Sequence, residues 1–195
     1  MEKEIQQFLT YLEIERDASS NTLRAYQSDI TELTEFLKRT GQLGNSQDDI
    51  TASQVDRHAI QSFISYLHSH RRSRATMERK IASIRSFFRF LKSRNLVSTN
   101  PTISIPLPRQ QRKLPKYLTP AEAAKLLDLP PAVQGLKALR NFAMAELMYA
   151  TGIRVSELVA IDIPDLDWHQ MELRVFGKGR KERIVPLTRL AVKRV

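Results

Sequence analysis

Four stretches within the first 94 residues repeat apolar side chains at the spacing of an α-helix. They are residues 4–16, 22–39, 51–67 and 76–94. An amphipathic helix of this kind is stable only when its apolar stripe is buried against another element. Either Thr51 or Ser53 is suited to cap the third helix. Four such stripes predict a compact four-helix bundle that forms a domain over residues 1–100.

The composition changes after the bundle. Residues 101–116 are rich in proline, have no periodicity and carry the basic side chains Arg109, Arg112 and Lys113. This pattern predicts an extended basic linker. A plain spacer would also explain the prolines, but it leaves the basic charges unexplained.

A second domain is expected over residues 117–195. Thr119 is suited to cap a helix that runs to about Asp128. A longer helix is expected over about 135–149, with four side chains buried: Leu139, Phe142, Leu147 and Met148. Two strand-like segments follow, Met171–Phe176 and Glu182–Leu187, and the turn between them reads Gly-Lys-Gly-Arg. The fold class is therefore mainly α with a small β-hairpin or sheet.

Three side chains of this second domain suggest chemistry on a phosphodiester. Arg154 and Glu157 are three residues apart in a helix-prone run, so they share a face and can pair. Lys178 lies between two glycines at the tip of the predicted hairpin. A fixed guanidinium binds phosphate oxygens in a bidentate way, and a lysine can also give up a proton. Taken singly, these residues could also be a surface ion pair and a solvated turn lysine.

The charge of the chain indicates a polyanionic partner. The formal net charge is +10 and the sequence pI is near 10.1, which favours nucleic acid. Between Arg71 and Arg94 there are nine basic residues, and Glu78 is the only acidic one. A solvated helix face is the usual explanation of a charge run, but so one-sided a run repels itself unless a counter-charge such as a DNA backbone is supplied.

Several other classes are excluded or disfavoured. Without cysteine there is no disulfide and no thiolate metal site, and no apolar run is long enough to span a membrane, so a cytoplasmic protein is expected. The glycines around Lys178 lack the remainder of a P-loop. His68 and His70 could seed a metal site, but they have no obvious carboxylate partner, and we expect no metal and no cofactor. The basic clusters HRRSR and GKGRK also resemble nuclear localisation runs, a pattern that is common by chance.

Two segments of the second domain, YATGIRVSEL (149–158) and GKGRKERIVPL (177–187), resemble the catalytic domain of tyrosine recombinases, most closely the bacterial Xer branch. The resemblance implies that Arg154 and Lys178 are catalytic, that Glu157 supports Arg154, and that this domain is the first part of an α+β catalytic domain. It also implies that the N-terminal bundle is a SAM-like core-binding domain, because ASSNTLRAYQSDITEL (18–33) and SRATMERKIASIRSFFRFL (73–91) are similar to segments that approach DNA in that family.

The resemblance therefore implies a set of DNA contacts on the second and fourth helices. They are Asn21, Thr22, Arg24, Arg74, Thr76, Arg79, Lys80 and Arg85. The implied partners are double-stranded DNA and other recombinase protomers, in a homo- or hetero-tetramer on DNA, which places the protein at the nucleoid. In that family a tyrosine attacks a phosphodiester to give a 3′-phosphotyrosyl link, and neither ATP nor a metal is needed.

The later elements of the family pattern are not found in these 195 residues. None of the four histidines has an arginine three residues on, and none of the five tyrosines falls where the nucleophile belongs. We expect this chain alone to bind DNA and not to cleave it, and an incomplete second domain to expose apolar surface. The alternative is a non-catalytic DNA-binding module or regulator derived from a recombinase.

Overall fold

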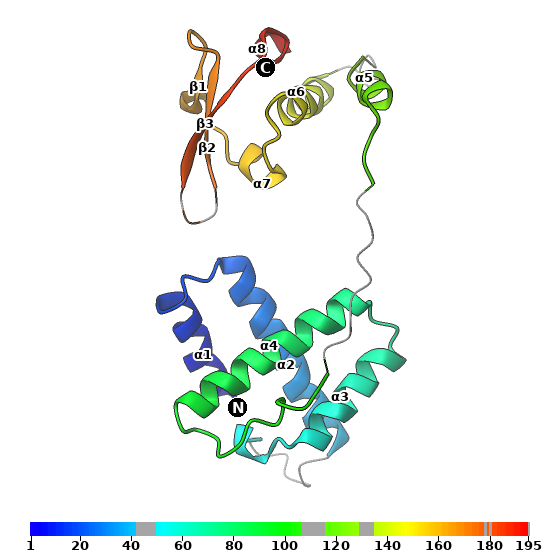
Figure 1. Cartoon of the computed structure of the whole chain (residues 1–195), viewed down its shortest axis with the longest axis vertical. Helices are drawn as coiled ribbons and strands as arrows, with labels where there is room; N and C mark the ends of the chain where they lie inside the picture. Colours follow the sequence, from blue (N-terminus) through cyan, green and yellow to red (C-terminus); the bar gives the residue numbers. More distant parts are fainter. Residues whose placement is uncertain (42–49, 107–115, 129–134, 178, 180, 195) are drawn as a thin grey trace. The chain divides into compact units, whose positions relative to one another are not determined.

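The computed structural model describes residues 1–41, 50–106, 116–128, 135–177, 179 and 181–194. The chain divides into two compact units, Met1–Lys113 and Leu114–Val195 (Figure 1). Each unit has a separate hydrophobic core.

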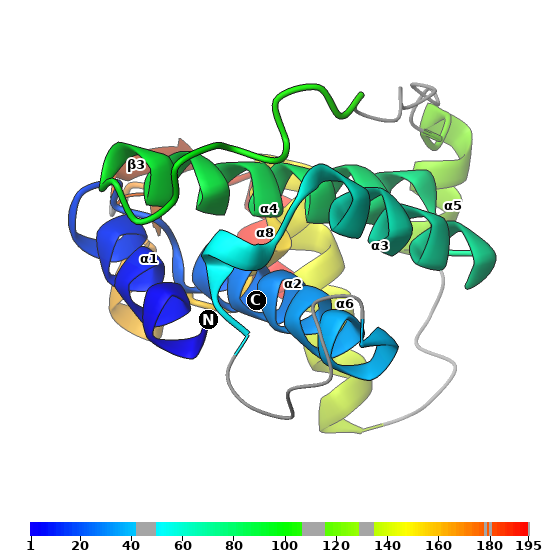
Figure 2. The same cartoon turned by 90° about the horizontal axis from the view of Figure 1, so that it is seen from below.

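The first unit is a bundle of four α-helices. They are α1 (Glu2–Ile14), α2 (Ser20–Thr40), α3 (Arg57–Ser69) and α4 (Arg74–Ser93). Helix α4 packs against each of the other three, and it lies beside α2 and α3 in Figure 2. The apolar stripes recognised in the sequence face this interior, which confirms the predicted bundle.

Aromatic rings fill the centre of the bundle. Phe8 of α1 and Phe87 of α4 are both completely buried, and their ring centroids are 5.4 Å apart in an edge-to-face arrangement. Phe63 and Phe88 are also completely buried. Edge-to-face pairs of this kind add to the stabilisation that comes from burying the apolar area.

Side-chain caps define where the helices begin. Ser19 accepts a hydrogen bond from the backbone N–H of Thr22 at the start of α2, and Ser73 accepts one from the N–H of Thr76 at the start of α4. These caps agree with the break expected before the second helix. They also engage the hydroxyls of Thr22 and Thr76, which lie 3.0 and 2.9 Å from the capping serine oxygens.

The expected cap of the third helix was wrong. Thr51 caps a single 3₁₀ turn, η1 (Ala52–Gln54), which ends at Val55. Val55 has an extended backbone and a buried side chain. The α-helix therefore starts afresh, and its cap is Asp56, which accepts a 2.8 Å hydrogen bond from the N–H of Ala59.

The chain that follows α4 stays on the bundle as far as residue 105. Thr102 and Ile105 are buried, and the Nη2 of Arg85 donates a 2.6 Å hydrogen bond to the carbonyl of Ile105. The start of the segment that the sequence suggested as a linker is thus packed against α4. Residues 107–115 lie outside the described residues.

The second unit combines short helices with a small sheet. Its elements are α5 (Pro120–Asp128), α6 (Leu136–Thr151), α7 (Val155–Leu158), η2 (Ile163–Asp165), β1 (Leu166–Asp167), β2 (Glu172–Phe176), β3 (Glu182–Pro186) and α8 (Arg189–Arg194). The sheet is antiparallel in the order β1-β2-β3, and Leu173 pairs with Val185 in the hairpin. The predicted hairpin is confirmed, whereas β1 is too short to produce a sequence pattern.

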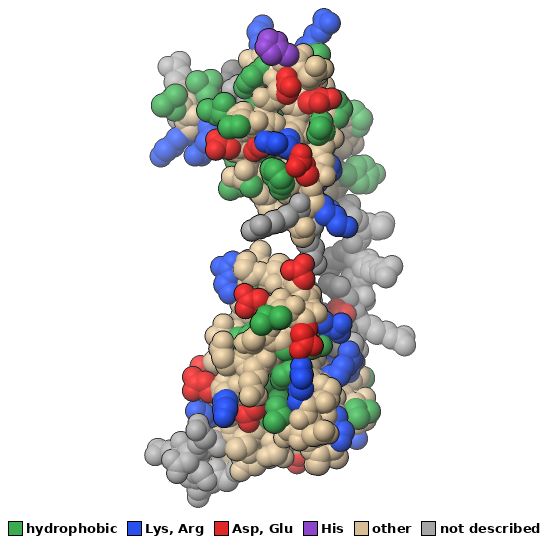
Figure 3. Space-filling model, turned by 90° about the vertical axis from the view of Figure 1, so that its left-hand side faces the viewer, with side chains coloured by type: hydrophobic (Ala, Val, Ile, Leu, Met, Phe, Trp, Pro, Cys, Tyr) green, Lys and Arg blue, Asp and Glu red, His purple; other side chains and the backbone are tan. Residues whose placement is uncertain are grey.

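The core of the second unit is small. It is formed by Leu147, Ile153, Leu158, Leu173, Val175, Leu187 and Ala191. The second half of α6 reaches this core, but the first half does not, so Leu139 is 60% exposed although it was expected to be buried. Val159 and Ile163 are also exposed, and apolar side chains are visible over the surface of this unit in Figure 3. No helix within the described ranges is both long and apolar enough to cross a membrane.

The central aromatic pair gives a test of the bundle. Phe8→Ala removes a ring with no exposed surface and leaves a cavity, so we expect the free energy of unfolding of this unit to fall by about 3–5 kcal/mol. Ile14→Ala on the same helix changes a residue that is 75% exposed and should shift it by about 0.5 kcal/mol or less. Denaturant unfolding followed by circular dichroism compares the two. Equal effects would contradict this description of the core.

Candidate nucleic-acid interface and active site

Arg154 is presented at a sharp junction between two helices. Helix α6 ends at Gly152, whose φ of +63° lies in the left-handed region and whose N–H bonds to the carbonyl of Met148. Two residues later Arg154 occupies the N-cap of α7, with its side chain 74% exposed. The turn at Gly152 therefore directs the guanidinium of Arg154 outward, where an anion can reach it.

Glu157 is the buried partner of Arg154. Its side chain is only 3% exposed. One oxygen, Oε2, accepts the backbone N–H of Arg154 at 2.7 Å, and the other, Oε1, accepts Nη1 of the same residue at 3.1 Å. The predicted pairing is confirmed, and the backbone bond adds a second constraint on the position of Arg154.

A second arginine, which sequence reasoning missed, completes this cluster. Arg183 of β3 donates Nη1 and Nη2 to the two oxygens of Glu157, at 2.8 and 2.9 Å. This bidentate geometry is the strong form of an arginine–carboxylate pair. The two residues are 26 positions apart, and Arg183 stands in a run of charges that looks like a solvated strand end. No local pattern could have identified it.

The two arginines hold Glu157 ionised. Hydrogen bonding from the side chain of Arg183 and from the backbone of Arg154 lowers the pKa of Glu157 from 4.5 to about 2. The same bond to Glu157 raises the pKa of Arg183. The cluster is thus one buried carboxylate between two guanidinium groups, with a net positive charge at the surface.

Gly177, the residue directly after β2, lies next to this cluster. The N–H of Gly177 donates a 2.7 Å hydrogen bond to the carbonyl of Lys181, which closes the turn after β2. A Cβ on Gly177 would be 3.6 Å from Nη1 of Arg183 and 3.6 Å from Oε1 of Glu157. Lys178 itself lies outside the described residues, but the chain on its N-terminal side reaches the Glu157 cluster.

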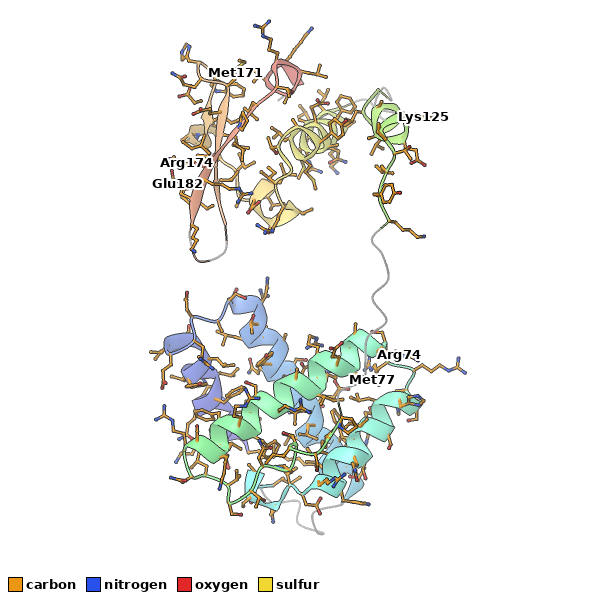
Figure 4. The ribbon with its side chains drawn as sticks, in the orientation of Figure 1. Arg74, Met77, Lys125, Met171, Arg174 and Glu182 are labelled. Atoms are coloured by element: carbon orange, nitrogen blue, oxygen red, sulfur yellow. The ribbon has the colours of Figure 1, made fainter. Side chains whose placement is uncertain are left out.

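On the first unit, several predicted DNA contacts are exposed. Asn21 and Arg24 are both on the surface of α2, and Nη2 of Arg24 donates a 2.7 Å hydrogen bond to Oδ1 of Asn21. Arg74 begins α4, and its side chain extends away from the bundle in Figure 4, while Met77 is buried. Arg79 is 44% exposed on the same helix.

The structure does not support Lys80 as a DNA contact. Its side chain is 6% exposed, and Nζ lies 2.8 Å from Oδ1 of Asp29 and 2.6 Å from Oε2 of Glu32. Both carboxylates come from α2. The argument that the basic run on α4 lacks an internal counter-charge was therefore wrong in part, because α2 supplies one.

One further expectation changes, and another is not tested by the described residues. Arg85 is half-buried, and its bond to the carbonyl of Ile105 makes it an anchor for the chain that follows α4. The basic residues of the linker, Arg109, Arg112 and Lys113, lie outside the described residues.

A groove joins α2 to the turn between α3 and α4. It has a volume of about 600 Å³ and includes Arg24, Gln27, Ser28 and Arg72 in its lining. Arg72 was part of the basic run in the sequence but not one of the predicted contacts. The fold places it on the same groove as Arg24, and Glu32 and Glu35 also line that groove, so that two guanidinium groups and two carboxylates face one concave surface. Among the described residues there is no cluster of three or more His, Cys, Asp or Glu that could hold a metal ion.

The comparisons with known proteins identify the class. Residues 5–95 match the family model "Phage integrase, N-terminal SAM-like domain", and residues 116–195 match "Phage integrase family". Together the two matches cover most of the chain in the order that the two units have. The chain belongs to the phage integrase family of tyrosine recombinases.

Individual relatives place it near the Xer branch. It is 39% identical over 190 residues to tyrosine recombinase XerC of Herpetosiphon aurantiacus, covering 96% of this chain and 59% of that protein. It is 38% identical over 187 residues to tyrosine recombinase XerD of Oceanobacillus iheyensis, covering 96% and 60%. The chain thus spans about three fifths of the length of the curated relatives that it matches.

A solved structure shares the fold. A lambda integrase tetramer bound to a Holliday junction aligns with a TM-score of 0.70 at 20% identity, covering 98% of this chain and 52% of that one.

The low pKa of Glu157 gives a test of the cluster. Because its pKa is depressed in the folded state, the stabilisation it supplies is complete above its ordinary pKa of 4.5 and is lost as pH falls towards 2. In Glu157→Gln the free energy of unfolding should depend less steeply on pH within that window. The difference in slope should correspond to the uptake of up to about one proton on unfolding. Glu182→Gln, an exposed change on β3 (Figure 4), should leave the dependence unaltered. Matching curves for wild type and Glu157→Gln would show that Glu157 is not held in this way.

Proposed function

We propose that this chain provides the DNA-binding bundle and the first catalytic residues of a site-specific recombinase. The complete reaction breaks and rejoins DNA strands through a 3′-phosphotyrosyl intermediate. The observation that carries the proposal is the cluster in which Glu157 fixes an exposed Arg154 and lies next to Gly177, the residue directly after β2. Family membership and the lambda integrase fold support it.

Arg154 is the proposed electrostatic catalyst. A guanidinium held by a buried carboxylate and by the backbone is preorganised, so it can stabilise the charge that develops on a phosphorus with five oxygen ligands. Glu157 is its positioning residue. Arg183 belongs to the same arrangement, because its bidentate bond ties the hairpin strand to the residue that holds Arg154.

Lys178 is the proposed general acid. Cleavage of a phosphodiester by a tyrosine releases a 5′-hydroxyl, and an ammonium on the hairpin tip can protonate that leaving oxygen. Its sequence position next to Gly177, which contacts the Glu157 cluster, supports this role.

The bundle is the proposed DNA-holding part. Arg24, Arg72, Arg74 and Arg79 are exposed on α2, on α4 or in the turn before α4, and such guanidinium groups neutralise backbone phosphates. The lambda integrase relative is a tetramer bound to a Holliday junction, and by analogy we propose that this protein also works with further protomers on double-stranded DNA.

Neither a His-x-x-Arg pair nor a tyrosine beyond the hairpin is found within these 195 residues. The chain as given is therefore proposed to bind DNA without cleaving it. A non-catalytic regulator derived from a recombinase would behave in the same way. A longer product of the same gene that forms a covalent DNA adduct would separate the recombinase from the regulator.

A nicked suicide duplex with Xer-type half-sites tests the proposal. We expect binding whose affinity falls steeply with salt and no covalent adduct on a denaturing gel. An adduct would mean that one of the five tyrosines is a nucleophile, and the absence of binding would refute the proposed function.

Single arginine variants sharpen this test. Arg24→Ala and Arg74→Ala should each reduce the slope of log affinity against log salt by about one, because each removes a phosphate contact. Arg57→Ala is the matched control. Arg57 is exposed at the first residue of α3, whereas Arg72 follows the other end of that helix. If Arg57→Ala reduced the slope of log affinity against log salt as much as the other two variants, DNA would not bind a defined surface of the bundle.

A further inference from the structure

A buried carboxylate in the bundle has no role in the function proposed so far. Asp29 of α2 has no exposed surface. Its Oδ1 accepts Nζ of Lys80 at 2.8 Å, and its Oδ2 accepts the hydroxyl of Ser83 at 3.1 Å and Nη1 of Arg79. All three donors come from α4. A buried charge is tolerated in a protein core only when it is paired and hydrogen-bonded in this way.

The pairing continues to the surface of α2. Lys80 also contacts Glu32 at 2.6 Å, and Glu32 lies 3.7 Å from Nη2 of Arg72. Asp29, Lys80 and Glu32 thus form a chain of alternating charges, buried at Asp29 and half-exposed at Glu32. At its two ends are Arg79 and Arg72, whose side chains are 44% and 51% exposed.

Arg79 is held from one side only. It donates Nη1 to Asp29, and its other N–H groups have no protein partner within the described part of the chain. A guanidinium has five N–H donors in a rigid plane, so fixing one edge aims the rest. An arginine that is already oriented loses less conformational freedom when it binds an anion than one that moves freely.

We propose that Asp29 is a positioning residue of the DNA-binding surface, which holds the guanidinium of Arg79 ready for a backbone phosphate. Lys80 is shared between Asp29 and Glu32, and with Arg79 and Arg72 at the two ends the chain of charges has one more cation than carboxylates. Arg79 therefore still presents positive charge to the solvent. This inference rests on the proposed function, because it assumes that the bundle binds DNA.

The direction in which Asp29→Asn changes DNA affinity shows whether Asp29 positions Arg79 or acts only through its negative charge. Asp29→Asn removes a negative charge from a protein that binds a polyanion, which by charge alone should tighten binding. Loss of a positioned arginine should instead weaken it. Lys80 keeps Glu32 as a partner in this variant, and asparagine retains the shape of the side chain.

Binding of the full chain to a duplex with Xer-type half-sites, at about 0.1 M salt, gives the first measurement. We expect Asp29→Asn to weaken affinity by about threefold to tenfold, the loss of one charge-assisted contact. Glu13→Gln is the matched control, because it makes the same change of charge at an exposed site on α1, outside the groove, and should leave affinity equal or higher. Equal or tighter binding by Asp29→Asn would overturn the inference.

A double-mutant cycle shows whether Asp29 acts through Arg79. In the Arg79→Ala background, Asp29→Asn should have no further weakening effect, whereas a general loss of structure would weaken both backgrounds alike. If the wild type shows no salt-dependent binding, the proposed function fails. If the wild type binds and Arg79→Ala weakens binding but Asp29→Asn does not, only this inference fails.

A measurement on the unaltered chain covers the case in which Asp29→Asn does not fold. Nitrogen-15 relaxation measures the mobility of the Nε groups of Arg79 and of the exposed Arg74 in the absence of DNA. The signal of Arg79 is assigned from its loss in Arg79→Lys. We expect the Nε of Arg79 to be the more ordered. Equal mobility of the two side chains would overturn the inference.

Discussion

The second unit depends on the bidentate bond between Glu157 and Arg183. Its hydrophobic core is small and joins α7 to β2 through Leu158, Leu173 and Val175. The side chains of β3 are exposed apart from the half-buried Val185, so packing alone gives this strand little to hold it to α7. The bond joins β3 to α7 at 2.8 and 2.9 Å, and the same carboxylate binds Arg154 through its backbone and its side chain. One buried anion therefore links the exposed Arg154 to strand β3.

The first unit also contains a buried carboxylate that holds a surface arginine. Asp29 is buried between α2 and α4 and holds Arg79, as Glu157 is buried between α7 and β3 and holds Arg154. In both cases a carboxylate binds part of a guanidinium and leaves the remainder at the surface. Such an arrangement weakens the field of the arginine but reduces the freedom that it loses on binding a phosphate. In each cluster the cations outnumber the carboxylates by one: Arg154 and Arg183 face Glu157, and Arg72, Arg79 and Lys80 face Asp29 and Glu32.

How far the sequence predicts this structure depends on the range of the interaction. The four helices of the bundle, the hairpin and the Arg154–Glu157 pair follow from patterns within a few residues and were predicted, although the start of the third helix was not. The roles of Lys80 and Arg183 were not, because their partners Asp29 and Glu157 are 51 and 26 residues away. A run of basic residues in a sequence does not show which of them another helix neutralises. Leu139 was misjudged for a similar reason, since its helical stripe does not show where the core ends.

Hydrogen–deuterium exchange of the β2–β3 hairpin tests most directly whether the Glu157 cluster organises the second unit. Arg183→Met should accelerate exchange at the amides of β3 and of the turn after β2, with no change in the first unit. Arg174→Met, which removes a more exposed pair with Asp165 from the same hairpin, should leave that exchange unaltered. Equal exchange in the two variants would contradict the account, because the hairpin would then be held by its backbone bonds alone.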